Sequence, residues 1–204
     1  MTTRFRQIRG RAGFTLMELM VVIAIIALLA GLTLGAFSFA TKSASRNRTA
    51  AAAAAIKSGL ENYKAEFGEY PEPADATSTI DIQKKTYRVG GAKMLYQAMS
   101  GDGTNAIKLS SGGTPSNGEI EDSEVENVML KDMPGTLWIK QDDEWFLIDG
   151  FRKPFQYTKG GGEDSVNSTY DLWSYSDDEE NTESVAKADK LDAKKSAKWL
   201  TNWR

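Results

Sequence analysis

The chain has 204 residues, enough for one membrane segment and one modest globular domain, and a formal net charge of −3. It contains no cysteine and no histidine, so no disulfide is available, and neither a Ser-His-Asp triad nor a histidine-ligated zinc centre can form. We therefore do not expect an enzyme. Nor do we expect a nucleic-acid-binding protein, because an acidic chain repels phosphates.

The N-terminus is a basic leader followed by a long apolar run. Residues 1–13 contain no acid and four arginines, and removal of this leader would lower the net charge from −3 to −7. Residues 14–39 are almost all apolar or small, which is long enough for a helix to cross a bilayer. The small residues stand before the apolar run rather than after it, which argues against an ordinary secretory signal, whereas a signal anchor stays open.

One acid, Glu18, interrupts the apolar run. An ionised carboxylate in hydrocarbon costs on the order of several kcal/mol unless something pairs with it, so we expect Glu18 to have a partner. Cleavage of the chain after Gly13 would create a new amino group on Phe14, close to this acid. That amine is the expected partner of Glu18.

The segment GFTLMELMVVIAII, residues 13–26, resembles the N-terminus of type IV pilins and of type II secretion pseudopilins, which share a class III signal peptide. The resemblance implies that a prepilin peptidase cleaves after Gly13 and methylates the new N-terminal residue, Phe14. It also implies that Glu18 is the family's acid at the fifth mature position. Gly13 and Phe14 are thus the predicted processing residues, and Phe14 and Glu18 are the predicted assembly residues.

Residues 40–70 are more polar but keep the spacing of a helix. Apolar residues four, three and four positions apart form one stripe of Ile56, Leu60, Tyr63 and Phe67. Gly68, with a proline soon after it, predicts the end of the helix. We therefore predict one continuous helix over residues 14–67, whose second half packs its stripe on a domain.

Residues 71–135 hold four of the chain's five prolines and many glycines and serines, which is typical of a connecting region. Within this region, the segment GGAKMLYQAMSG, residues 90–101, predicts a short helix between glycine stops. The apolar residues that indicate its buried face are Met94, Leu95, Ala98 and Met99.

Residues 136–204 contain the strand signals. TLWIK and EWFLID flank the polar QDD and predict one antiparallel hairpin, and PFQYT and TYDLWSY predict a second. Their aromatic residues alternate with polar ones, which favours a core over a carbohydrate-binding or base-stacking surface. The predicted fold class is α+β. We expect a pilin-like fold, in which a long N-terminal helix, first transmembrane and then amphipathic, packs on a small antiparallel sheet of about four strands.

Three segments resemble signatures of the major pseudopilin of type II secretion systems: DGFRKPFQY (149–157), YDLWSYSDD (170–178) and TNW (201–203). In that family the loop after the second signature binds calcium. The resemblance implies a Ca²⁺ ion held by the main-chain carbonyl of Tyr175 and the carboxylate of Asp178, with Asp189 as a later acid. The loop departs from the family pattern at several positions, so a solvated acidic turn stays the alternative.

The resemblance implies a structural subunit of a periplasmic pseudopilus that drives type II protein secretion. Its expected location is the bacterial inner membrane, crossed once, with the C-terminal domain in the periplasm. The expected partners are further copies of the chain, minor pseudopilins, the inner-membrane platform protein and prepilin peptidase. The chain has no nucleotide-binding motif, so the force would come from a separate ATPase. Two alternatives stay open: a type IV pilus pilin, and a membrane-anchored binding module that never polymerises.

Overall fold

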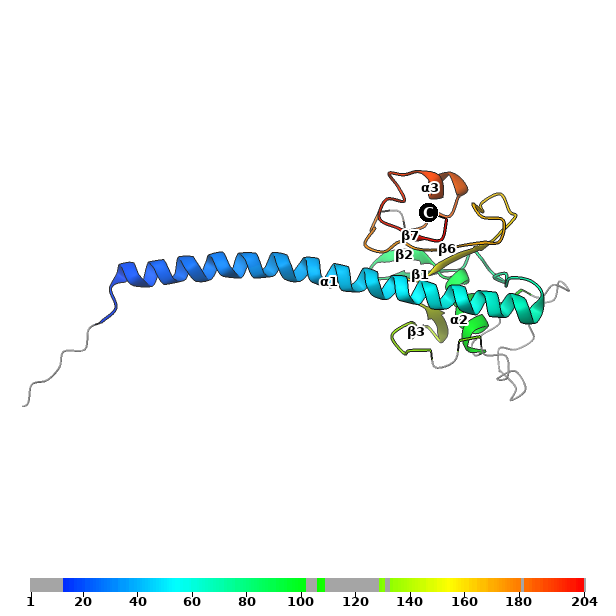
Figure 1. Ribbon diagram of the computed structural model, residues 1–204, viewed down its shortest axis with the longest axis horizontal. Coiled ribbons are helices and arrows are strands. Elements are labelled where there is room, and N and C mark those ends of the chain that lie inside the picture. The colour runs from blue at the N-terminus through cyan, green and yellow to red at the C-terminus, as the bar shows by residue number, and fades with distance from the viewer. Residues whose placement is uncertain (1–12, 102–105, 109–128, 131–132, 181, 204) are drawn as a thin grey trace, which may run out of the picture. The chain divides into compact units, whose positions relative to one another are not determined.

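The computed structural model describes residues 13–101, 106–108, 129–130, 133–180 and 182–203 (Figure 1). The predicted leader, except Gly13, and most of the predicted connecting region after residue 101 lie outside the described residues. The chain divides into two compact units, residues 1–41 (unit 1) and residues 42–204 (unit 2).

Unit 1 contains the first part of helix α1 (Leu16–Phe67). The helix is continuous over 52 residues, so the predicted long helix is confirmed, with a start two residues later than expected. Its large apolar side chains before residue 40 are exposed, for example Leu34 at 72% and Phe39 at 78%. Among the described residues, α1 is the one helix long and apolar enough to cross a membrane. A surface this apolar requires lipid or other helices around it.

Unit 2 contains the second part of α1, which buries one face made of Thr49, Ala52, Ala53, Ile56, Gly59 and Leu60. The predicted stripe is confirmed at Ile56 and Leu60, is partly buried at Tyr63, and reaches the surface at Phe67, which is 47% exposed. The helix ends because Gly68 adopts a left-handed φ of 81°, and its N–H donates to a carbonyl of the last helical turn at 2.8 Å.

Helix α2 (Gly90–Ser100) confirms the predicted short helix, and its four indicated apolar residues are all buried: Met94, Leu95, Ala98 and Met99. Met99 packs against α1 where Gly59 has no side chain, since a Cβ on Gly59 would lie 2.2 Å from the Met99 sulfur. Gly101 ends α2 in the left-handed conformation. A third, short helix, α3 (Lys187–Leu191), follows near the C-terminus.

Strands β1 (Thr79–Ile82) and β2 (Lys85–Arg88) form an antiparallel hairpin inside the region that the sequence predicts to be connecting. The two turn residues, Gln83 and Lys84, both have positive φ, 52° and 66°. Turns of this kind usually recruit asparagine and glycine. The sequence lacks that signal here, which is why its pattern does not predict the hairpin.

The other strands follow the predicted pairing. β3 (Trp138–Gln141) pairs with β4 (Glu144–Leu147), and β5 (Gln156–Lys159) pairs with β6 (Tyr170–Ser174), both antiparallel. A short strand, β7 (Leu200–Thr201), adds to the other edge of β6. The α+β class with small antiparallel sheets is confirmed, but the described strands form three separate sheets rather than one sheet of about four strands.

The aromatic residues of these strands serve the core, as predicted. Phe146 and Trp173 are buried in one hydrophobic cluster, whereas Trp138 and Trp145 are partly buried and pack against a second cluster, which contains Ile56 of α1. Trp145 stacks on Tyr96 of α2 with ring centroids 5.7 Å apart. The rings therefore join the strands to α2.

Candidate functional site

The predicted cleavage site lies in exposed, non-helical chain just before α1. Phe14 is 86% exposed. Among the described residues, no atom beyond its chain neighbours lies within 4 Å of the point where Gly13 would carry a Cβ. The described residues therefore leave the predicted cleavage site exposed.

Glu18, the predicted assembly residue, lies in the first turn of α1 and is bound by Thr15. The Thr15 main-chain N–H and hydroxyl donate to Oε2 of Glu18 at 2.9 and 3.0 Å, and the Glu18 N–H donates back to the Thr15 hydroxyl at 3.2 Å. This reciprocal pattern is a capping box, and the positive end of the helix dipole further favours a carboxylate there. No donor among the described residues reaches Oε1, so one carboxylate oxygen is open to an outside cation.

Thr15 is a residue of this candidate site that the charge of Glu18 alone does not reveal. The signal is nevertheless present in the sequence, because Thr-x-x-Glu directly before an apolar run is the pattern of a capping box. Glu18 therefore has a partner in its own chain before any amine is created by cleavage.

A tight turn over residues 149–153, the Asp149 turn, organises unit 2. The buried Asp149 carboxylate accepts hydrogen bonds through Oδ1 from the N–H groups of Phe151 and Lys153, at 2.8 and 2.9 Å, and through Oδ2 from the Ser174 hydroxyl. Burial raises the pKa of Asp149, and these hydrogen bonds act against that rise because they favour the carboxylate. The turn is thereby joined to strand β6.

The second part of α1 holds both this turn and the segment after β6. The Gly150 N–H donates to the Thr49 hydroxyl of α1 at 3.0 Å. A Cβ on Gly150 would lie 2.1 Å from the Ser45 carbonyl oxygen, so only glycine fits at this position. Arg46 donates to the Asp177 carboxylate at 2.7 Å and to the Lys198 carbonyl at 3.2 Å. One α1 side chain therefore bridges the beginning and the end of the segment between β6 and β7.

That segment, residues 175–199, is the C-terminal loop, and it contains the predicted calcium ligands. Asp178 is 2% exposed, and its Oδ1 accepts the Glu180 N–H at 3.0 Å while its Oδ2 accepts the Trp199 indole N–H at 2.8 Å. The Tyr175 carbonyl accepts the Asp178 N–H at 2.9 Å. Each predicted ligand at the start of the loop therefore bonds to an N–H group of the chain.

Lysine ammonium groups also contact the loop. Lys153 of the Asp149 turn donates to the main-chain carbonyls of Ser176 and Asp178, at 2.8 and 2.7 Å. Asp189, farther along the loop, pairs with the ammonium of Lys195. The sequence signatures do not predict that Lys153 binds the loop, because its hydrogen-bond acceptors are main-chain atoms more than twenty residues away.

Residues 8–34 match the prokaryotic N-terminal methylation motif. The chain carries the class III signal peptide of a type IV pilin-like protein. No curated protein sequence and no solved structure matches the chain. Type IV pilin-like proteins are processed by prepilin peptidase, anchored in a membrane through the apolar helix, and typically structural rather than enzymatic. The matched residues include Gly13, Phe14 and Glu18.

The contacts around Tyr175, Asp178 and Asp189 can be compared with the needs of calcium. Ca²⁺ takes about six to eight oxygen ligands. Both carboxylate oxygens of Asp178 are bound by N–H donors, and Asp189 is paired with a lysine. The described part of the chain contains no cluster of three or more Asp, Glu, His or Cys side chains placed to hold a metal. This arrangement does not fit a calcium ion held by the three predicted residues.

Proposed function

We propose that this type IV pilin-like protein is a structural subunit of a periplasmic pseudopilus that drives type II protein secretion. Before assembly, residues 16–39 of α1 hold the subunit in the inner membrane, with unit 2 in the periplasm. The same helix segment then forms the contacts of the filament. Prepilin peptidase, the inner-membrane platform protein and minor pseudopilins are the partners in this process.

The observation that carries the proposal is an apolar helix segment that no described residue of the chain covers. Every large apolar side chain from Leu16 to Phe39 is exposed by 47% or more. Lipid tails and apolar helices are similar surroundings for such side chains, so packing and polar contacts decide between them. A helix of this kind moves from lipid into a helix bundle at little hydrophobic cost.

Glu18 supplies the polar contact that favours the bundle. Thr15 binds Oε2 and leaves Oε1 open, so in lipid the charge of Glu18 is only partly compensated. In a filament, the Phe14 amine of a neighbouring subunit binds Oε1 and completes the compensation. This amine is created by cleavage after Gly13, so unprocessed subunits lack the partner that assembly needs.

Two features of unit 2 support the pseudopilus over a type IV pilus. The segments DGFRKPFQY and YDLWSYSDD are similar to signatures of the major pseudopilin, and they form the Asp149 turn and β6. The chain also lacks the cysteines with which many type IV pilins close their C-terminal region.

Cysteine crosslinking of the full chain in the membrane tests assembly, because introduced cysteines are its only thiols. We expect pairs that join Leu16→Cys to a cysteine placed between residues 20 and 26 to give a ladder of oligomers. Gly13→Glu, which blocks cleavage, should abolish the ladder. A single Glu163→Cys, at an exposed position of unit 2, is the control for random collision.

The outcomes separate the alternatives. A ladder no stronger than that of the control identifies a membrane-anchored module that does not polymerise. A ladder, combined with unchanged export of secreted enzymes and loss of surface pili when the gene is deleted, identifies a type IV pilin. A ladder combined with loss of export supports the pseudopilus.

A further inference from the structure

The C-terminal loop leaves β6, passes through α3 and returns to β7, and the chain has no cysteine to close it. Two lysine side chains make central contacts that hold this loop. Lys153 reaches its start from the Asp149 turn, and Lys190 lies within it, in α3. Both place a cation against oxygen atoms of the chain.

Lys153 binds the start of the loop as a small cation would. The carbonyl oxygens of Ser176 and Asp178 converge on its ammonium, at 2.8 and 2.7 Å. Main-chain carbonyls that converge on one point are also how loops bind metal ions. Burial lowers the pKa of Lys153, and the positive charge of Lys85 acts in the same direction. The negative charges of Asp149, Glu179 and Asp178 oppose this shift. The two carbonyl oxygens, rather than the pKa, are the feature that favours a cation at this point.

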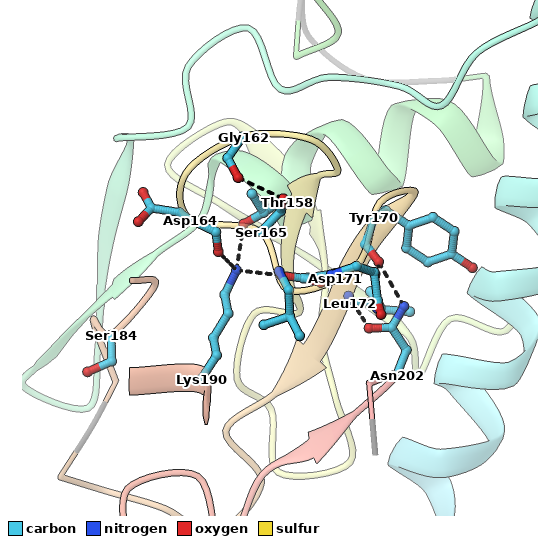
Figure 2. Close-up of polar contacts among 12 residues, drawn as sticks. Thr158, Gly162, Asp164, Ser165, Tyr170, Asp171, Leu172, Ser184, Lys190 and Asn202 are labelled. Carbon is cyan, nitrogen blue, oxygen red and sulfur yellow. Dashed lines mark hydrogen bonds and ion pairs between the residues drawn. The ribbon is translucent and has the colours of Figure 1, made fainter. Parts of the chain in front are cut away.

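Lys190 joins the later part of the loop to the β5–β6 hairpin through hydrogen bonds and an ion pair (Figure 2). Its ammonium donates to the Asp171 carboxylate at 2.8 Å, to the Asp164 carbonyl at 2.7 Å and to the Thr158 hydroxyl at 3.3 Å, and it lies 4.3 Å from the centre of the Trp173 ring. The side chains of Lys190 and Asp171 are both fully buried. This ammonium is therefore surrounded as a bound ion would be.

The Asp171 carboxylate also accepts hydrogen bonds from main-chain groups. The N–H groups of Val166 and Asn167 donate to it at 2.8 and 2.9 Å. Asn202, just after β7, donates to the Tyr170 carbonyl at 3.0 Å and so ties the returning chain to the same strand, as Figure 2 shows. The anion, the cation and the returning chain thus form one connected polar cluster.

We infer that the ammonium groups of Lys153 and Lys190 are built-in cations of the C-terminal loop, with Lys153 in the place of a divalent ion between the carbonyl oxygens of Ser176 and Asp178, so that the loop folds without metal. A divalent ion at the first site would have to displace Lys153 and would be repelled by its charge. The inference concerns the folding of unit 2 and holds whichever filament the protein forms.

Calcium dependence of the wild-type protein is the first test. The full chain, purified in detergent micelles and stripped with EGTA, is unfolded by heat in EGTA and in excess calcium chloride, with tryptophan fluorescence as the signal. We expect the same midpoint in both. A midpoint that rises with calcium would overturn the inference, and this comparison does not depend on any variant.

Lysine variants are the second test. Lys190→Met should lower the unfolding midpoint by about 10 °C, because it leaves a buried carboxylate without its cation. Lys153→Met should lower it by less, since Lys153 is only partly buried. Lys187→Met removes an exposed lysine of the same helix and is the matched control. Midpoints equal to that of the control would overturn the inference.

Limited proteolysis of the wild-type protein tests the inference even if a lysine variant does not fold. The wild-type loop should be cleaved at the same rate in EGTA and in calcium. Protection by calcium would show that a metal ion, rather than the two lysines, closes the loop.

Discussion

Glu18 and Lys190 are both charged groups set among apolar side chains, one at the start of α1 and the other in the C-terminal loop. Lys190 is fully buried, and its ammonium is bound by three oxygen atoms of the chain. Glu18 is exposed, and among the described residues it is bound by Thr15 through Oε2 alone. We therefore expect the fully partnered charge to serve the fold of its own chain, and the charge that is partnered on one side to bind another molecule.

The largest effect is expected from Lys190. Lys190→Met should lower the free energy of unfolding by about 3–5 kcal/mol, because the Asp171 carboxylate stays buried without its cation. Equilibrium unfolding in denaturant measures this loss. The double variant Lys190→Met with Asp171→Leu should recover part of it, since both charges are then gone. A single variant as stable as the wild type would contradict the role of this pair in the fold.

A smaller effect, on assembly rather than folding, is expected from Glu18. Glu18→Ala should leave cleavage after Gly13 and the unfolding of unit 2 unchanged, and should reduce the crosslinked ladder by about tenfold or more. The reason is that removal of one partner of a desolvated ion pair costs about 2–5 kcal/mol. Filaments and secretion at wild-type levels in this variant would refute the pairing of Glu18 with a neighbouring amine.

An effect smaller than that of Glu18 is expected from Thr15, whose hydroxyl takes part in the capping box. Thr15→Val removes the hydroxyl of the capping box and should cost about 1 kcal/mol, which corresponds to a loss of assembled subunits of about fivefold. Thr15→Ser keeps the hydroxyl and should assemble normally. The same crosslinking assay measures both variants. Equal assembly of the valine and serine variants would mean that the hydroxyl does not position Glu18.

The smallest effect is expected from the exposed ion pair of Arg46 and Asp177. A hydrogen bond from Arg46 lowers the pKa of Asp177. Because this folded-state pKa lies below that of the unfolded chain, the contribution is present at neutral pH and is lost as the pH falls through the folded-state pKa. We expect the difference in unfolding free energy between wild type and Asp177→Asn to be below about 1 kcal/mol at pH 7, since both side chains are partly exposed. Denaturant unfolding over a range of acidic pH should show that difference disappear, and a constant difference would contradict the assignment.

The sequence predicts the parts of this protein that depend on residues close together in the chain. The apolar run, the stripe on α1 and the stop at Gly68 all follow from spacing and composition, and the strand pairs around QDD follow from alternation. The β1–β2 hairpin does not, because Gln83 and Lys84 adopt positive φ without the usual turn residues. The role of Thr15 could have been predicted, because Thr-x-x-Glu is a capping pattern. The position of Glu18 in an apolar run draws attention to its charge instead.

Composition and residue spacing are enough to identify a class III signal peptide, a long helix that begins with an apolar segment, and a small α+β domain. The contacts that hold the C-terminal loop follow from the folded structure instead. Arg46 reaches Asp177 across 131 positions of the chain, and Lys153 and Lys190 bind main-chain oxygens as well as side chains. Main-chain oxygens are present at every residue, so no pattern of residue types distinguishes those that meet a cation. Packing alone selects them.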